Sequence, residues 1–114
     1  MKNNIVTADF ATGKWVLSRH LFQYDYGIRL VIHGIELPGV FVCDFCNLGD
    51  KCAETVTGED QAVMIPDKLL QSGADIICYV VSTGSHERKT IGEIRIPVIR
   101  RAKLPRGVNE NTVL

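Results

Sequence analysis

Three cysteines within ten residues are the side chains most able to do chemistry in this sequence. Cys43 and Cys46 have the CxxC spacing of many zinc sites, and Cys52 follows six residues later. Zinc sites place such a pair in a tight turn, where both sulfurs converge on the metal. Here residues 41–47 have the composition of a β-strand, so side chains three apart point to opposite faces. With no second CxxC and no paired histidine, all the cysteines, Cys78 included, are expected to be reduced thiols rather than metal ligands.

The histidines and acidic residues form no recognisable catalytic set. His20, His33 and His86 are far apart, no nucleophile-elbow motif is present, and the order along the chain pairs no histidine with a cysteine. Glu59 and Asp60 fit a turn, and the other carboxylates are scattered. No glycine cluster opens a helix that could bind phosphate. The sequence therefore predicts a protein that is not an enzyme, with no catalytic residue, cofactor or metal ion.

The most concentrated charge is basic and lies at the end of the last predicted strand. It comprises Arg95, Arg100, Arg101, Lys103 and Arg106. Such a stretch either docks an acidic partner surface or is a solvated strand end and tail. The first four of these residues are the candidates for partner docking.

Aromatic residues gather in the first quarter of the chain and allow a second kind of site. A carbohydrate-binding module exposes aromatic rings as a platform for sugar rings. Core packing explains Trp15 and Phe22 without a ligand. Tyr24 and Tyr26 flank a turn, so these two are the candidates for stacking against a glycan.

The candidate side chains must be positioned by predicted strands. These are short runs rich in Val, Ile, Phe, Tyr and Thr, and glycine or proline separates one run from the next. Residues 28–33 show the pattern well, because Ile28, Leu30 and Ile32 would face inward while alternate residues face water. Further strands are expected over 40–47, 51–57, 61–65, 74–82 and 89–99, the last two as a hairpin. Residues 65–73 are the one predicted helix, since proline suits its first turn and glycine suits a left-handed stop.

These runs predict an all-β fold, namely an antiparallel β-sandwich of about eight to nine strands with one short helix before the final hairpin. Pro97 fits an edge position or the end of a strand, because it cannot donate to a ladder. The sandwich domain is expected over residues 1–99. A polar, flexible tail is expected over residues 100–114.

Length and charge restrict the classes of partner. The chain has 114 residues, enough for one domain, with 46% hydrophobic residues and a formal net charge of +0. A neutral chain lacks the long-range attraction to phosphate on which binders of nucleic acid and acidic membranes depend. Residues 1–9 lack the apolar core of a signal peptide, and no apolar run approaches the roughly 20 residues of a membrane span. A soluble protein made in the cytoplasm is expected.

Five strings follow one another along the chain at residues 15–27, 35–38, 44–47, 65–73 and 94–98, within a region of about 12–103. In that order they resemble small proteins encoded in prophages of clostridia-like Gram-positive bacteria. Those proteins in turn resemble the N-terminal domain of the upper baseplate protein family of tailed phages. The most specific are the Gln-aromatic-Asp-x-Gly turn at 23–27 and the Ile-Pro-Asp-x-Leu-Leu-Gln-Ser-Gly segment at 65–73. The cysteines between 43 and 52 are not part of the family's pattern.

The resemblance implies a β-sandwich that acts as an attachment module in a phage tail or baseplate. Its partners would be copies of itself and other tail or baseplate proteins, in the virion after synthesis in the bacterial host. Few residues follow the predicted domain, so the chain is expected to be an adaptor or a piece of a longer, fibre-bearing protein. The alternative is a carbohydrate-binding module that recognises host cell-surface glycan through Tyr24 and Tyr26.

Overall fold

The computed structural model describes residues 4–103, whose strands and 3-10 helix follow the predicted alternation of short apolar runs and turns. The strands are β1 (Ile5–Ala11), β2 (Lys14–Leu17), β3 (Leu21–Phe22), β4 (Arg29–His33), β5 (Val40–Asn47), β6 (Glu54–Glu59), β7 (Ala62–Met64), β8 (Ile76–Thr83), β9 (Arg88–Ile96) and β10 (Val98–Ile99). The 3-10 helix η2 (Asp67–Leu70) lies between β7 and β8.

Eight of the strands form one mixed sheet in the order β2-β1-β4-β7-β6-β5-β8-β9. β1 and β4 are parallel, the other neighbours are antiparallel, and a separate parallel pair joins β3 to β10. The prediction of an all-β fold is confirmed, but the antiparallel arrangement is wrong. After the β1–β2 hairpin the chain returns through β3 and adds β4 to the free side of β1, and this crossover makes β1 and β4 parallel.

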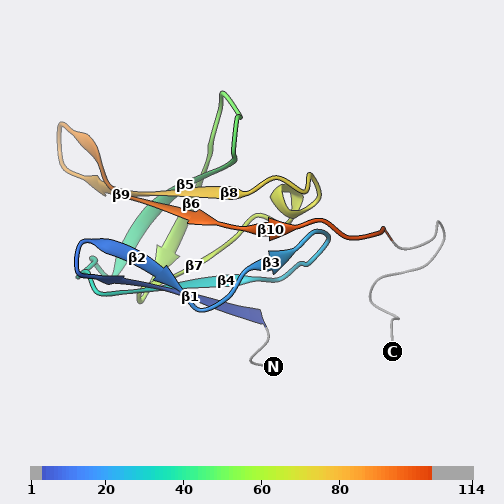
Figure 1. The fold of residues 1–114 in the computed structure, drawn as a ribbon. Helices are drawn as coiled ribbons and strands as arrows, with labels where there is room; N and C mark the ends of the chain where they lie inside the picture. The colour runs from blue at the N-terminus through green and yellow to red at the C-terminus, as the bar shows by residue number, and fades with distance from the viewer. Residues whose placement is uncertain (1–3, 104–114) are drawn as a thin grey trace.

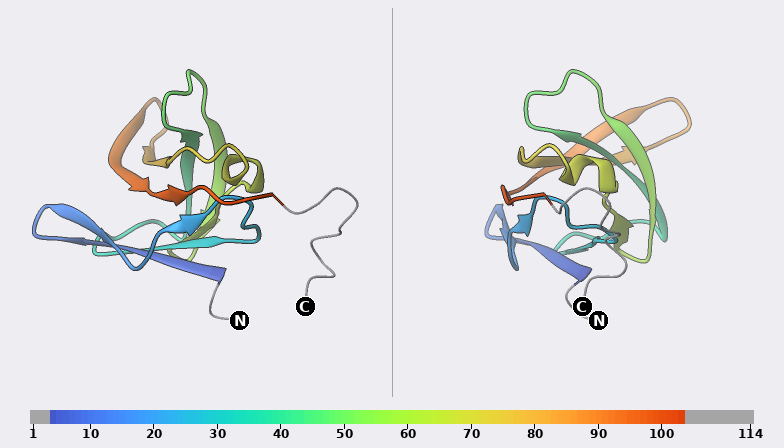
Figure 2. Two further views of the ribbon diagram at one scale, coloured as in Figure 1. Left: turned by 45° about the vertical axis from the view of Figure 1, so that its right-hand side comes forward. Right: turned by 90° about the vertical axis from the view of Figure 1, so that its right-hand side faces the viewer.

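The large sheet is nearly barrel-shaped rather than plainly a sandwich (Figure 2). β6 and β7 share one residue pair, Glu59 with Ala62, so the sheet opens beyond that pair into two four-stranded halves. Figure 1 shows β6-β5-β8-β9 as an upper layer and β2-β1-β4-β7 as a lower one. On the opposite side the halves meet again, because β3 continues from β2, β10 continues from β9, and these two strands pair.

The side of each strand that faces inward forms the core. Ile28, Leu30 and Ile32 are buried, as their alternation predicts. The other core residues include Val6, Ala8, Leu21, Phe41, Cys43, Phe45, Val63, Ile65, Leu69, Leu70, Ile76, Cys78, Val80, Ile94, Ile96 and Val98. Both layers and η2 therefore contribute to one continuous interior.

The predicted helix over 65–73 is shorter and of another kind than expected, since only Asp67–Leu70 is helical. The carbonyls that would continue an α-helix accept hydrogen bonds from elsewhere. Leu69 O accepts from Asn47 Nδ2 at 2.8 Å, and Leu70 O accepts from Tyr24 N at 2.9 Å. The expected left-handed stop is confirmed, because Gly73 has φ +78°.

The predicted hairpin of residues 74–82 and 89–99 is confirmed as β8 and β9, but β9 ends at Ile96. Pro97 cannot donate to β8, so the chain leaves the large sheet there. Pro97 O instead accepts from Leu21 N at 2.9 Å, which begins the pairing of β10 with β3. The expectation that Pro97 ends a strand is therefore confirmed.

Trp15 lies in the seam between β2 and β9, the two edges of the large sheet. A Cβ atom at Gly92 would lie 3.3 Å from Cζ2 of Trp15, so the indole packs directly over the backbone of β9. The Phe10 ring contacts the indole with centroids 5.1 Å apart. The aromatic ring thus fills the seam where the two edges are not hydrogen-bonded to each other.

Candidate docking surface

The basic segment 100–103 and the loop 23–27, which carries Tyr24 and Tyr26, are far apart in the sequence. They meet where the chain leaves β10. Gln23 joins them, since its Nε2 donates to Gln71 O at 2.9 Å and its Oε1 accepts from Arg101 N at 3.2 Å. Gln23 N also donates to Ile99 O at 2.8 Å. Figure 1 shows β3, β10 and η2 at this same end of the molecule. We refer to Phe22, Tyr26, Ile99, Arg100, Arg101 and Lys103 as the exit surface.

The loop that carries the tyrosines rests on η2. Tyr24 N donates to Leu70 O at 2.9 Å, and Gly27 N donates to Asp67 Oδ1 at 2.9 Å. Asp25 closes the turn, because its Oδ2 accepts from Phe22 N at 3.0 Å. The turn at 23–27 and the segment at 65–73 are therefore bonded to each other. Sequence reasoning identified both but could not join them, because some forty residues separate them.

The two tyrosines differ in their surroundings. Tyr24 is half-buried and has φ +74°, a left-handed conformation that is costly for a residue with a side chain. Tyr26 is 48% exposed. A glycan could therefore stack far more readily on Tyr26 than on Tyr24.

Phe22 and Ile99 form an exposed apolar pair on the outer face of the β3–β10 sheet. They are register partners, 43% and 44% exposed. The ring of His20 meets Phe22 edge-on, with centroids 5.1 Å apart. The expectation that Phe22 packs in the core is wrong, because Leu21 takes the inward position and alternation turns Phe22 outward. Trp15 is half-buried and does pack against the core.

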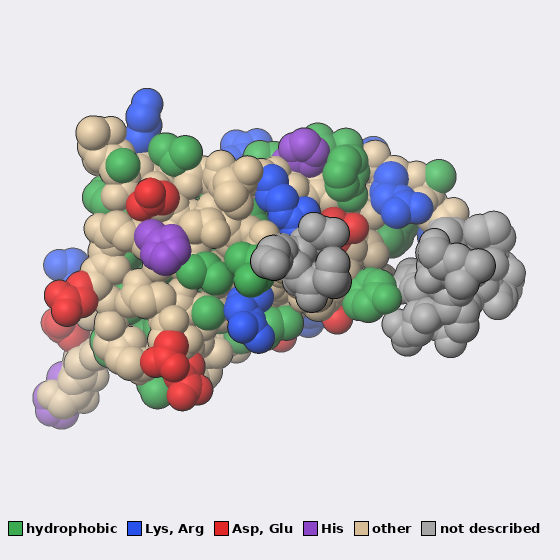
Figure 3. Space-filling model, turned by 90° about the horizontal axis from the view of Figure 1, so that it is seen from below, with side chains coloured by type: hydrophobic (Ala, Val, Ile, Leu, Met, Phe, Trp, Pro, Cys, Tyr) green, Lys and Arg blue, Asp and Glu red, His purple; other side chains and the backbone are tan. Residues whose placement is uncertain are grey.

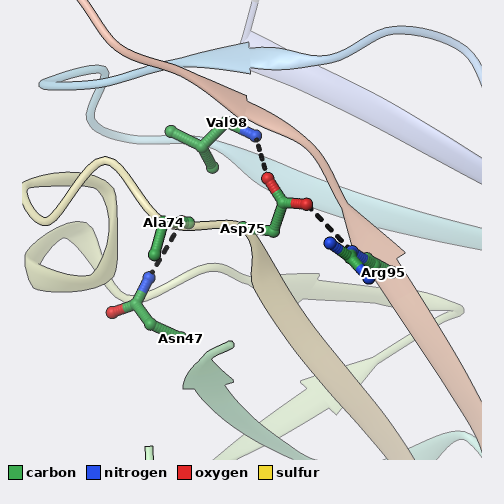
Figure 4. A network of polar contacts seen from close by, with 5 residues as sticks. All are labelled: Asn47, Ala74, Asp75, Arg95 and Val98. Carbon is green, nitrogen blue, oxygen red and sulfur yellow. Dashed lines mark hydrogen bonds and ion pairs between the residues drawn. The ribbon is translucent and has the colours of Figure 1, made fainter. Parts of the chain in front are cut away.

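Arg95, the first of the four docking candidates, is engaged within the domain. Its Nε lies 2.9 Å from Asp75 Oδ2, while Asp75 Oδ1 accepts from Val98 N at 3.1 Å (Figure 4). Beside this pair the buried Asn47 donates to Ala74 O at 3.1 Å. These contacts hold the junction between β9 and β10. A half-exposed ion pair of this kind contributes at most about 1 kcal/mol, so its main effect is to position the chain.

Arg100, Arg101 and Lys103 are exposed and follow one another out of β10. The stem of Arg100 lies over Gly73, where an added Cβ atom would be 3.0 Å from Arg100 Cγ. Arg106 lies outside the described residues, as does the predicted tail beyond Lys103. The structure thus brings three of the four docking candidates to the exit surface.

Cys43, Cys46 and Cys52 do not converge. Cys43 points into the core beside Cys78, whereas Cys46, three residues later on the other face of β5, is buried but lies outside the core cluster. Cys52 is exposed. A hydrogen bond to Cys43 and burial raise the pKa of Cys78 well above its usual range, so this thiol stays protonated. Residues 4–103 contain no group of three or more His, Cys, Asp or Glu side chains arranged to hold a metal ion.

A depression lies where the two halves of the sheet separate. It has a volume of about 530 Å³ and is lined by Arg29, Thr57, Glu59, Asp60, Ala62, Val63 and Met64. It exists because β6 and β7 diverge after their single pair. Sequence reasoning missed it, since β4, β6 and β7 contribute to it together.

The face below β1 and β4 is mixed in character where residues 4–103 form its visible surface. That face carries small groups of hydrophobic side chains separated by charged ones (Figure 3).

Within residues 4–103, no helix has the length and apolar character that crossing a membrane requires. No protein-family model matches the sequence, and no curated protein matches it.

Proposed function

We propose that this protein is a non-enzymatic structural module of a tailed phage or prophage, which attaches to other tail or baseplate proteins through the exit surface. The observation that carries this proposal is the bonded junction of residues 23–27 with residues 65–73. These two segments are the most specific part of the resemblance to the baseplate family, and together they support the exit surface. The module is made in the bacterial host and then enters the virion.

The chemistry of the exit surface supports attachment. Exposed aromatic and arginine side chains are enriched where proteins bind one another, and Phe22 and Arg101 lie within this one surface.

Purified phage particles test the proposal. Prophage induction in the bacterium that carries the gene should release particles containing this chain in a fixed ratio to the tail proteins, as measured by quantitative mass spectrometry. Deletion of the gene should leave particles that lack a tail or baseplate part in electron micrographs. Complete, infectious particles from the deletion strain would contradict the proposal.

The exposed ring of Tyr26 favours one alternative, binding of a cell-surface glycan. Titration calorimetry with fragments of host cell-wall glycan should then show binding that Tyr26→Ala abolishes. Tyr24→Asn is the matched control, because asparagine tolerates the left-handed backbone at that position. If the wild-type protein binds none of the fragments, this alternative is wrong.

A further inference from the structure

We propose that copies of this chain bind one another head to tail, with the Phe22–Ile99 pair of one copy seated in the depression between β6 and β7 of the next. This inference rests on the proposed function only in treating the exit surface as a binding surface. The partner is a second copy of this chain, and the contact is between two different surfaces.

The Phe22–Ile99 pair and the depression lie on opposite sides of the barrel. Going round from the β3–β10 pair, four strands (β2, β1, β4, β7) lead to the depression one way and four (β9, β8, β5, β6) lead to it the other way. The Phe22–Ile99 pair of one copy therefore cannot occupy the depression of the same copy. Two bound copies together retain one unoccupied Phe22–Ile99 pair and one unoccupied depression, so the contact repeats along a row or closes into a ring.

The two surfaces share a small apolar contact. The Phe22–Ile99 pair projects from a two-stranded sheet, and each residue is more than two-fifths exposed. The lining of the depression is mainly polar, but Met64 is 43% exposed there and lies beside the half-buried Ala62. Seating the pair against Met64 would remove apolar surface from water in both copies, which favours association.

The charges are also complementary. Arg100, Arg101 and Lys103 flank the projecting pair, whereas Glu59 and Asp60 lie at the rim of the depression. The loop that bears Glu36 lies beside that rim, because Asp60 N donates to Gly39 O at 2.9 Å and Leu37 N donates to Gln61 Oε1 at 3.1 Å. Among residues 4–103, Arg29 is the one basic residue that lines the depression, and its guanidinium could lie against the ring of Phe22 of the next copy.

The depression is held open before any partner arrives. Asp60 and Gln61 have φ of +55° and +67°, the backbone of a tight two-residue hairpin. Gln61 Nε2 donates to Ile32 O at 2.8 Å and to Ile35 O at 3.2 Å, which ties this turn to the end of β4. A preformed site loses little conformational entropy on binding.

The edges of the sheet are less suited to pairing with a second copy. The edge strand β9 begins with Arg88 and Lys89 and carries a register shift opposite Val80 and Val81. The other edge, β2, has four residues and begins with Lys14. Short, charged or irregular edges resist the addition of a further strand. The contact between exit surface and depression is therefore favoured over edge-to-edge pairing.

Two variants test the inference by sedimentation velocity. The exit variant carries Phe22→Ser and Arg101→Ser, and the depression variant carries Glu59→Gln, Asp60→Asn and Met64→Ser. The wild-type protein should form oligomers that grow with concentration and dissociate as salt rises. Each variant alone should self-associate at least about tenfold more weakly. An equimolar mixture should form dimers and nothing larger, because each variant retains one intact surface.

The controls distinguish a variant that has lost the contact between copies from a variant that no longer folds. Circular dichroism and thermal melting should be unchanged in both variants, because the substituted side chains are all exposed. Val16→Ser with Lys89→Ser, which removes an exposed apolar and a basic side chain elsewhere, should associate like the wild type. A monomeric wild-type protein, variants that associate normally, or a mixture that stays monomeric would each overturn the inference.

Failure of the inference and failure of the proposed function have different results. A monomeric protein that is nevertheless a fixed component of phage particles leaves the attachment function standing and removes the head-to-tail contact. Salt-sensitive oligomers of a protein that is absent from phage particles would support the head-to-tail contact and contradict the attachment function.

Discussion

Two glutamine side chains link segments that lie far apart in the chain. Gln23 joins β3 to the end of η2 and to the segment after β10, while Gln61 joins the β6–β7 turn to the loop after β4. An amide can donate and accept at once, so one side chain satisfies backbone groups from two segments. One of these residues supports the exit surface, and the other supports the depression.

A charged pair on the outer face of the upper layer predicts a dependence of stability on pH. Asp44 accepts from Arg88 Nη2 at 2.6 Å and from Thr55 Oγ1 at 2.6 Å. The hydrogen bond from Arg88 is the main cause that holds the pKa of Asp44 below its usual range. A carboxyl group whose pKa is lower in the folded state stabilises the protein above its unfolded pKa of about 3.9. That stabilisation is lost as pH falls through the folded pKa.

The free energy of unfolding should therefore decrease more steeply below about pH 4 for the wild type than for Asp44→Asn. Urea denaturation at a series of pH values measures this difference. Asp9→Asn is the control, because Asp9 is exposed on β1, and it should leave the profile unchanged. Parallel profiles for the wild type and Asp44→Asn would show that the Arg88 contact does not persist in solution.

At the scale of elements, η2 and the glycine that follows it position the exit surface. η2 is too short to be stable by itself, so hydrogen bonds from the 23–27 loop and from Asn47 hold it in place. Gly73 then turns the chain in a left-handed conformation and leaves room for the stem of Arg100. This element therefore depends on two segments that precede it by about twenty and forty residues.

Gly73→Ala should destabilise the protein by about 1–2 kcal/mol, because an alanine at φ +78° is strained and its Cβ would lie 3.0 Å from Arg100 Cγ. Gly39→Ala is the matched control, since Gly39 has no positive φ and no atom within 4 Å of an added Cβ. The control should change stability by less than about 0.5 kcal/mol. Chemical denaturation of both variants measures the difference, and equal stabilities would contradict this account of Gly73.

At the scale of the whole molecule, the near-barrel is closed in two different ways. At one end β3 and β10 pair through backbone hydrogen bonds, and in the seam between β2 and β9 the indole of Trp15 covers Gly92. Glycine is unfavourable in a strand unless another group must approach closely, and Trp15 is that group here. The register shift beside Gly92 adds to the local bend of β9.

Gly92→Val should open this seam, because its side chain would occupy the space of the indole. We expect a loss of about 1–3 kcal/mol in the free energy of unfolding, as for other overpacked sites. Trp15 is the sole tryptophan, so its fluorescence should shift to longer wavelength as the ring becomes more exposed. Gly92→Val combined with Trp15→Leu should recover part of the stability, and an unshifted spectrum in Gly92→Val would contradict the packing described.

The sequence by itself determined the local features of this protein. Alternation of apolar residues at 28–33 predicted which side chains are buried, and Pro97 predicted where a strand ends, since both depend on the backbone of a few neighbouring residues. Only the tertiary structure decided which strands pair in parallel, that Phe22 is exposed, and that residues 65–73 form a brief 3-10 turn instead of a longer helix. Those outcomes depend on partners more than twenty residues away in the sequence. The exit surface and the depression arise in the same way, because each is built from segments that only the closure of the sheet brings together.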